Sequence, residues 1–143
     1  MLNEALFNDI NIRKKMKFNL LGKISIIIVS LALLAGCGAA LVRNVDAAMI
    51  TGNHSVANVE KAIVRAGTDL GWMMTKKSDK HIVGKLALRT HLAVIDITFD
   101  KNSYSIKYKD STNLGYNGSS IHSNYNGWIQ NLQKAIALQI NIL

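Results

Sequence analysis

The residue whose type and setting most strongly indicate chemistry is Cys37, the only cysteine in the 143-residue chain. It follows Leu34, Ala35 and Gly36, so a thiol comes directly after two small residues. Residues 24–35 carry no charge, and a group of basic residues precedes them: Arg13, Lys14, Lys15, Lys17 and Lys23. A thiol in its ionised form is a nucleophile, so Cys37 is a candidate for attachment of another group.

An uncharged run of about a dozen residues is typical of the apolar region of a signal peptide, and it is shorter than the roughly 20 residues that span a bilayer as a helix. Residues 34–37 resemble the lipobox of bacterial lipoproteins. This resemblance implies that the signal peptidase recognises Leu34, Ala35 and Gly36, and that a diacylglycerol is attached to Cys37 before cleavage in front of it. The alternative is a buried thiol in a membrane anchor or a core helix.

The lipobox predicts three parts: a signal peptide over residues 1–36, a lipidated tether over 37–53 and a single folded domain over 54–143. Met16 would open a more conventional signal peptide than Met1, because acidic residues lie between them, and we expect translation to start there. Five of the 17 basic and two of the nine acidic residues precede Cys37, which leaves the mature chain with a net charge of +5.

The resemblance also predicts a location. One acyl chain binds a membrane reversibly, whereas two or three, such as palmitate and the chains of diacylglycerol, anchor a protein stably. In the lipoproteins that the chain resembles, aspartate after the cysteine favours the inner membrane. This chain has Gly38 there, which implies the outer membrane, facing the periplasm. The net positive charge is compatible with anionic headgroups or cell-wall polymers, or with a simple solvated surface.

Hydropathy patterns predict a two-layer α+β fold. Ser55 can cap a helix that ends near Gly71, and Asn124 can cap a final helix that runs to the end of the chain. Alternation over residues 82–89, 93–99 and 104–109 predicts a three-stranded antiparallel meander, with a turn at 100–103. We expect the order helix, three strands, helix, with both helices on one side of the sheet. Whether residues 71–80 add a strand stays open.

Two clusters are candidate ligand-binding sites. Arg89 and His91 lie at the expected turn between the first two strands, where a guanidinium and an imidazole could bind a carboxylate or phosphate. The alternative is that Arg89 lies on the surface or pairs with Asp110 or Asp46. The second cluster combines polar and aromatic side chains, as sugar or peptide sites do, although the same residues could cap a helix and fill the core. Its members are Asp110, Ser111, Asn113, Tyr116, His122, Asn124, Tyr125, Asn126 and Trp128.

Other site chemistry is not indicated. The four histidines, His54, His81, His91 and His122, do not have the spacing of a compact metal site, and there is no second cysteine. No serine elbow, carboxylate pair or phosphate loop is recognisable, so we expect no cofactor and no catalytic residues. The envelope location argues against nucleic acid as a partner.

The run from residue 89 to the end contains Arg-x-His, Tyr-Ser-Ile-x-Tyr, Asp-Ser-x-Asn-Leu-x-Tyr, Ile-His-x-x-Tyr-Asn and Trp-Ile-x-x-Leu. It resembles a group of small proteobacterial lipoproteins without an assigned activity. We therefore expect an envelope lipoprotein that binds a partner rather than an enzyme, the partner being an envelope protein, peptidoglycan or an anionic glycolipid. The alternative is a small periplasmic hydrolase or ligand-binding enzyme that uses Arg89, His91 and His122.

Overall fold

The computed structural model describes residues 38–143. The predicted lipobox and the predicted start at Met16 therefore lie outside the described residues. The compact unit that holds the described elements runs from Ala39 to Leu143. Its elements are β1 (Ala39–Leu41), β2 (Val45–Met49), α2 (Val56–Asp69), β3 (Met73–Ser78), β4 (His81–Leu88), β5 (His91–Phe99), β6 (Ser103–Thr112), β7 (Ser120–His122) and α3 (Ser123–Asn141).

The sheet is larger than the sequence predicts. Five strands pair in the order β2-β6-β5-β4-β3, with every neighbouring pair antiparallel, and β1 pairs with β7 in a separate two-stranded sheet. Strands hold 42% of the described residues and helices 31%. The prediction of a two-layer α+β domain built on a three-stranded meander is therefore wrong: the domain is mostly β, and β4, β5 and β6 form only the middle of its main sheet.

The additional strands come from segments without an alternating pattern. β1 and β2 fall within residues 37–53, where we expected a tether, and β2 has a register shift between Val45 and Ala48. β3 is the other edge of the sheet, and five of its six residues are exposed. An edge strand that buries few side chains has little need for an apolar face, so the period of two is lost. The folded domain begins at Ala39 rather than near His54.

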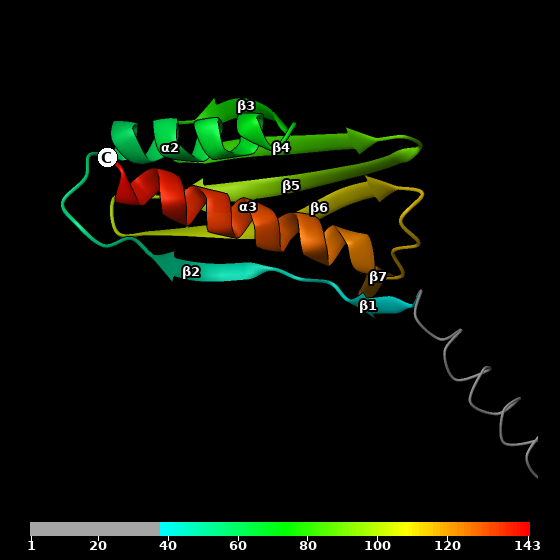
Figure 1. Ribbon diagram of the computed structural model, residues 1–143. Coiled ribbons are helices and arrows are strands. Elements are labelled where there is room, and N and C mark those ends of the chain that lie inside the picture. The colour runs from blue at the N-terminus through cyan, green and yellow to red at the C-terminus, as the bar shows by residue number, and fades with distance from the viewer. Residues whose placement is uncertain (1–37) are drawn as a thin grey trace, which may run out of the picture. The chain divides into compact units, whose positions relative to one another are not determined.

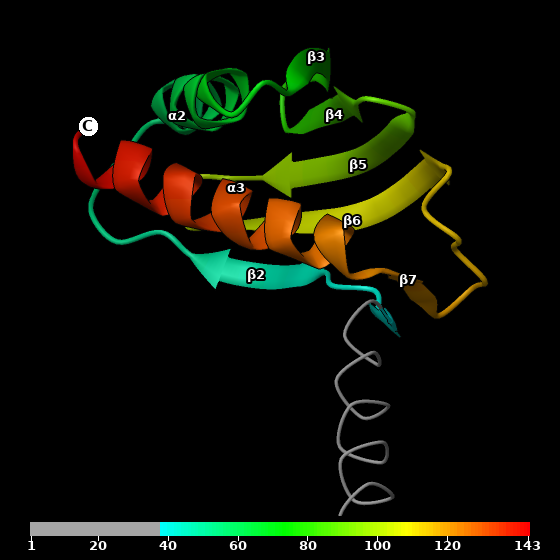
Figure 2. The ribbon, with the colours of Figure 1, turned by 45° about the vertical axis from the view of Figure 1, so that its right-hand side comes forward.

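Both helices cover one face of the five-stranded sheet (Figures 1 and 2). The predicted cap of α2 is confirmed, because Ser55 Oγ accepts a hydrogen bond from the Asn58 N–H at 3.2 Å. The prediction for α3 is wrong by two residues: His122, not Asn124, is the cap. Between the layers lies a core whose largest fully buried side chains include Ile63 of α2, Ile129, Leu132 and Ile136 of α3, and Ile82, Ile95, Ile97 and Ile106 of the sheet.

Two glycines let α2 approach the sheet closely. Met74 of β3 pairs with Gly84 of β4, and a Cβ added at Gly67 of α2 would lie only 2.5 Å from the Met74 sulfur. A Cβ at Gly84 would lie 3.3 Å from the same sulfur and 3.0 Å from Ile95 Cγ1. The Met74 side chain therefore occupies space that both glycines leave free, which suits a flexible thioether.

The opposite face of the sheet carries polar side chains. Asp96 alternates with the buried Ile95 and Ile97, so it points away from the core, where His81 Nε2 lies 2.6 Å and Lys109 Nζ 2.9 Å from its Oδ1. Burial acts to raise the pKa of Asp96, but the hydrogen bonds from Lys109 and His81 outweigh it and hold the pKa below its ordinary value. The cluster joins three neighbouring strands, through the Lys109–Asp96 ion pair and the hydrogen bond between His81 and Asp96.

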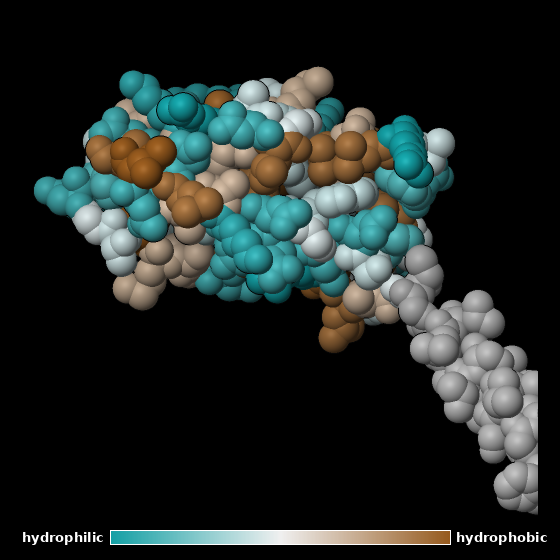
Figure 3. Space-filling model, in the orientation of Figure 1, coloured by the Kyte–Doolittle hydropathy of each residue, from teal (hydrophilic) through white to brown (hydrophobic). Residues whose placement is uncertain are grey.

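Surface hydropathy is mixed in the space-filling view (Figure 3), with apolar atoms gathered where α3 ends and a second apolar projection beside β1. Among the strongly exposed apolar residues are Leu41 of β1 and Met49 of β2. No helix in residues 38–143 combines the length and the hydropathy needed to cross a membrane.

Candidate functional site

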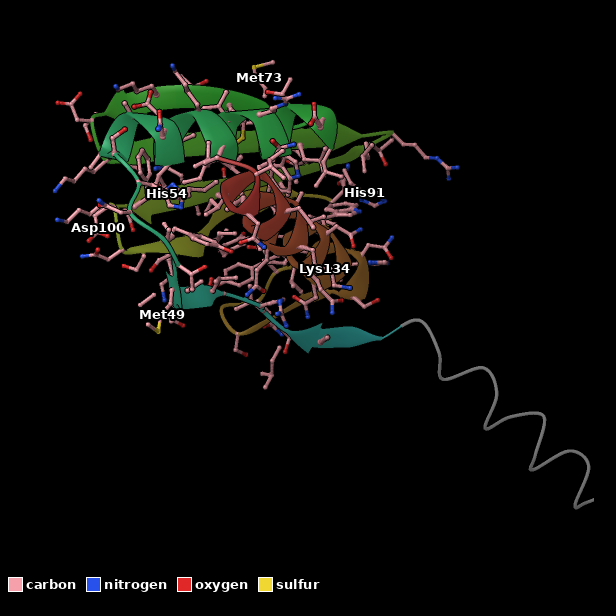
Figure 4. The ribbon with its side chains drawn as sticks, turned by 60° about the vertical axis from the view of Figure 1, so that its left-hand side comes forward. Met49, His54, Met73, His91, Asp100 and Lys134 are labelled. Carbon is pink, nitrogen blue, oxygen red and sulfur yellow. The ribbon has the colours of Figure 1, made fainter. Side chains whose placement is uncertain are left out.

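The structure brings the two predicted clusters together at one end of the sheet. We call it the β1 end, and it consists of β1, β7, residues 88–91 at the β4–β5 turn, and residues 113–119. Asn113 joins its parts, because His91 Nδ1 donates to the Asn113 carbonyl at 2.7 Å and Asn113 Nδ2 donates to the Thr90 carbonyl at 2.7 Å. Figure 4 shows His91 on the side of the domain away from Met49, His54 and Asp100.

Two of the predicted histidines lie side by side. The ring centroids of His91 and His122 are 6.0 Å apart. Because His91 Nδ1 donates to a carbonyl, its Nε2 keeps a lone pair when the ring is neutral. His122 is the reverse: its Nδ1 accepts from the Asn124 N–H at 3.2 Å, so its Nε2 carries the proton. The pair thus offers one acceptor and one donor to a ligand.

This arrangement is poorly suited to a metal ion. A metal needs the lone pair of each imidazole that binds it, and in His122 the Nδ1 lone pair is used to cap α3 while Nε2 carries the proton. The other histidines lie elsewhere, with His54 on the Thr51 carbonyl and His81 on Asp96. Within residues 38–143, no group of three or more His, Cys, Asp or Glu residues is placed to hold a metal.

Arg89 is exposed at the tip of the β4–β5 turn. Its backbone has a φ of +55°, the left-handed region that glycine and asparagine adopt more readily. Neither of the ion pairs considered from the sequence is found: Asp46 pairs with Lys107, and the Asp110 carboxylate accepts from the Ser111 N–H. Among the described residues, Arg89 makes no ion pair within 4.0 Å, so its guanidinium is available at the surface.

The aromatic members of the second cluster serve mainly to build the fold. Tyr108 stacks on Tyr116 with centroids 4.1 Å apart and meets Tyr125 edge-on at 5.7 Å. Tyr125 is fully buried, and burial, reinforced by the neighbouring Tyr108 and Tyr116, raises the pKa of its hydroxyl. Trp128 is half-buried against the core. Tyr116 is the exposed member, although its hydroxyl donates to the Gly118 carbonyl at 2.9 Å.

Asn126 attaches β1 to the start of α3. Its Nδ2 donates to the Leu41 carbonyl at 2.8 Å, and its Oδ1 accepts from the Arg43 N–H at 2.8 Å. Arg43 also donates from Nη2 to Gln133 Oε1 at 2.9 Å. Asn113, His122 and Asn126 were predicted as ligand-binding residues, and in the structure all three make internal hydrogen bonds.

Sequence reasoning missed two residues of this end. Leu41 is 76% exposed on β1, and Leu88 is 43% exposed where β4 ends. Leu41 fell within the expected tether, where an isolated leucine carries no signal, and Leu88 matched the alternation of a buried strand face. The position of Leu41, four residues after Cys37, was the only available indication. Comparisons of the chain with family models, with curated proteins and with solved structures found no significant match.

Proposed function

We propose that this protein is an envelope lipoprotein: Cys37 is acylated, the chain is cleaved before it, and the domain from Ala39 onward is a binding module rather than an enzyme. The observation that carries the proposal is the position of the domain boundary. The compact unit begins at Ala39, two residues after the cysteine of the lipobox-like sequence. Cleavage before Cys37 would thus remove no strand, helix or core residue of the domain.

The basic residues, the apolar run and the lipobox-like residues 34–37 support the same proposal from the sequence. Acylation with two or three chains would hold the domain stably at a membrane. Because Gly38 follows the cysteine, we propose the outer membrane, with the domain in the periplasm.

Most of the candidate site residues make contacts within the fold, which leaves few of them free to act as catalytic groups and therefore favours a binding module over an enzyme. Tyr125 and Trp128 pack in or against the core, and Asn113, His122 and Asn126 each make a hydrogen bond to the backbone. One observation favours the alternative, a small periplasmic hydrolase or ligand-binding enzyme: His91 and His122 lie 6.0 Å apart with complementary ring nitrogens. For this alternative, replacing Arg89, His91 or His122 by alanine should abolish the cellular phenotype of the protein, and unchanged phenotypes would exclude it.

Fractionation with labelled palmitate tests the main proposal. The wild-type chain should incorporate the label and sediment with membranes, whereas Cys37→Ser should do neither. Gly38→Asp is the matched control for sorting, since a side chain at this position meets nothing within 4 Å. It should keep the label and move from the outer to the inner membrane. Incorporation of palmitate by Cys37→Ser at the wild-type level would refute the proposal.

A partner can be sought by crosslinking intact envelopes. If the domain is a binding module, wild-type protein should recover an envelope protein, peptidoglycan or an anionic glycolipid above the level seen with Cys37→Ser.

A further inference from the structure

We propose that the β1 end lies directly on the phospholipid bilayer, with Leu41 and Leu88 in the interfacial layer and Arg89 at the headgroup phosphates. This inference rests on the proposed acylation of Cys37. It adds an orientation and a lipid-binding surface that anchoring alone does not require, because many anchored domains could stand away from the membrane on a tether.

Chain length places the β1 end at the membrane. Only Gly38 separates Cys37 from Ala39, and the two residue steps from Cys37 to Ala39 span at most about 7 Å. The headgroup layer on one side of a bilayer is about 5 to 8 Å thick. Ala39 already belongs to β1 and pairs with His122 of β7, so there is no slack before the folded domain begins. An acylated Cys37 would therefore hold β1 and β7 within or just above the headgroups.

The β1 end is held together as one surface, so β1 cannot readily peel away to serve as a longer tether. Besides its pairing with β7, β1 receives a hydrogen bond from Asn126 Nδ2 at the Leu41 carbonyl, and the next residue, Val42, donates to the Ser119 carbonyl at 2.8 Å. His122 N in turn donates to the Leu114 carbonyl at 2.9 Å. The loop from 113 to 119 is thereby joined to the strand nearest the anchor.

The exposed side chains at this end fit a lipid interface. Leu41 and Leu88 are exposed apolar side chains, and Tyr116, 39% exposed, is an amphipathic ring of the kind that is enriched at headgroup depth. Apolar side chains that enter the interfacial layer strengthen the binding of an acylated protein. Burial in lipid also removes the cost of exposing these groups to water.

Arg89 supplies the polar part of the contact. Its guanidinium has the forked geometry that suits phosphate oxygens, and its exposed side chain has no ion pair within residues 38–143. It also occupies a left-handed backbone conformation, at φ +55°, that asparagine or glycine would adopt with less strain. An arginine at this position makes sense when its side chain has a role outside the turn.

Site-directed spin labelling of the lipidated mature chain, residues 37–143, in phospholipid vesicles that contain no other protein tests the inference. Because acylation blocks Cys37, a cysteine introduced at Leu41, Leu88 or Met49 becomes the only thiol open to the label. Met49 is the matched control, since it is 85% exposed on β2 and Figure 4 places it away from His91. Labels at 41 and 88 should collide several times more often with oxygen, and less with a water-soluble nickel chelate, than the label at 49.

Two variants then test the proposed contacts with the label at 88. Leu41→Asp should shift the collision rates of this label to those of the label at 49. Arg89→Asn should shift them in the same direction, and because asparagine suits the turn at least as well as arginine, this shift would reflect the lost guanidinium rather than an altered turn. Equal collision rates at 41, 88 and 49 in chains that float with the vesicles would overturn the docking surface while leaving acylation intact. Labels that become less accessible to the nickel chelate only in native envelopes would instead indicate a protein partner and would also overturn the docking surface. Chains that carry no acyl group and fail to float would refute the proposed function itself.

Discussion

Replacing Tyr125 by phenylalanine should leave the domain as stable as the wild type or make it more stable. Tyr125 is fully buried, and its hydroxyl has no hydrogen-bond partner among the described residues. A buried hydroxyl without a partner costs about 1–3 kcal/mol in mutational data. Its removal recovers this cost, less a small loss of packing where the oxygen was, so we expect a gain of about 0 to 2 kcal/mol.

Tyr104→Phe is the matched control. Tyr104 is 4% exposed, and its hydroxyl donates to the Gln133 carbonyl at 3.3 Å. The same chemical change there removes a hydrogen bond and leaves a carbonyl without this donor, which should destabilise the domain by about 0.5–1.5 kcal/mol. The two variants should therefore differ in sign as well as in size.

Urea unfolding of residues 39–143, followed by the fluorescence of the buried Trp72 and the half-buried Trp128, measures the difference. Because the free energy of unfolding falls by about 1–3 kcal/mol for each molar of urea, the unfolding midpoints of the two variants should be separated by about 1 M. If Tyr125→Phe lowers the midpoint as much as Tyr104→Phe does, then Tyr125 has a hydrogen-bond partner and the description of its environment is wrong.

Further predictions concern the core and the ion pairs of the sheet. Leu132→Ala should destabilise the domain by about 2–5 kcal/mol, whereas Leu138→Ala, on the exposed face of α3, should change stability by less than about 0.5 kcal/mol in the same assay. The lowered pKa of Asp96 means that its stabilisation by Lys109 and His81 is present above about pH 4 and is lost as the pH falls through its folded pKa. Asp96→Asn should therefore be less stable than wild type at pH 7, and this difference should shrink as the pH falls below about 4, as measured by urea unfolding over that range; a constant difference would contradict this assignment.

The sequence predicts those elements whose buried faces are long and regular. Val59 and Ile63 mark the buried stripe of α2, and Ile95 and Ile97 mark the core face of β5, so periodicity alone located both elements. The turn at 100–103 was also predictable, because Asp100 accepts hydrogen bonds from the Asn102 and Ser103 N–H groups as turn aspartates do.

The remaining elements depend on partners far along the chain. β1 pairs with β7 and β2 pairs with β6, and the paired residues, such as Ala39 with His122, are many tens of positions apart. Neither short strand has a local pattern that identifies it. The same holds for the candidate site. His91 and His122 could be named from the sequence, but their proximity depends on how distant strands pair, and the opposite hydrogen bonds of their rings depend on the Asn113 carbonyl and on the cap of α3.

Mass spectrometry of the mature protein purified from bacterial envelopes tests the central claim most directly. The first residue should be Cys37, and its peptide should carry the mass of a diacylglycerol, with or without an additional acyl group on the new amino terminus. A peptide that runs uncut from Gly36 through an unmodified Cys37 would contradict the account, and with it the orientation proposed for the β1 end.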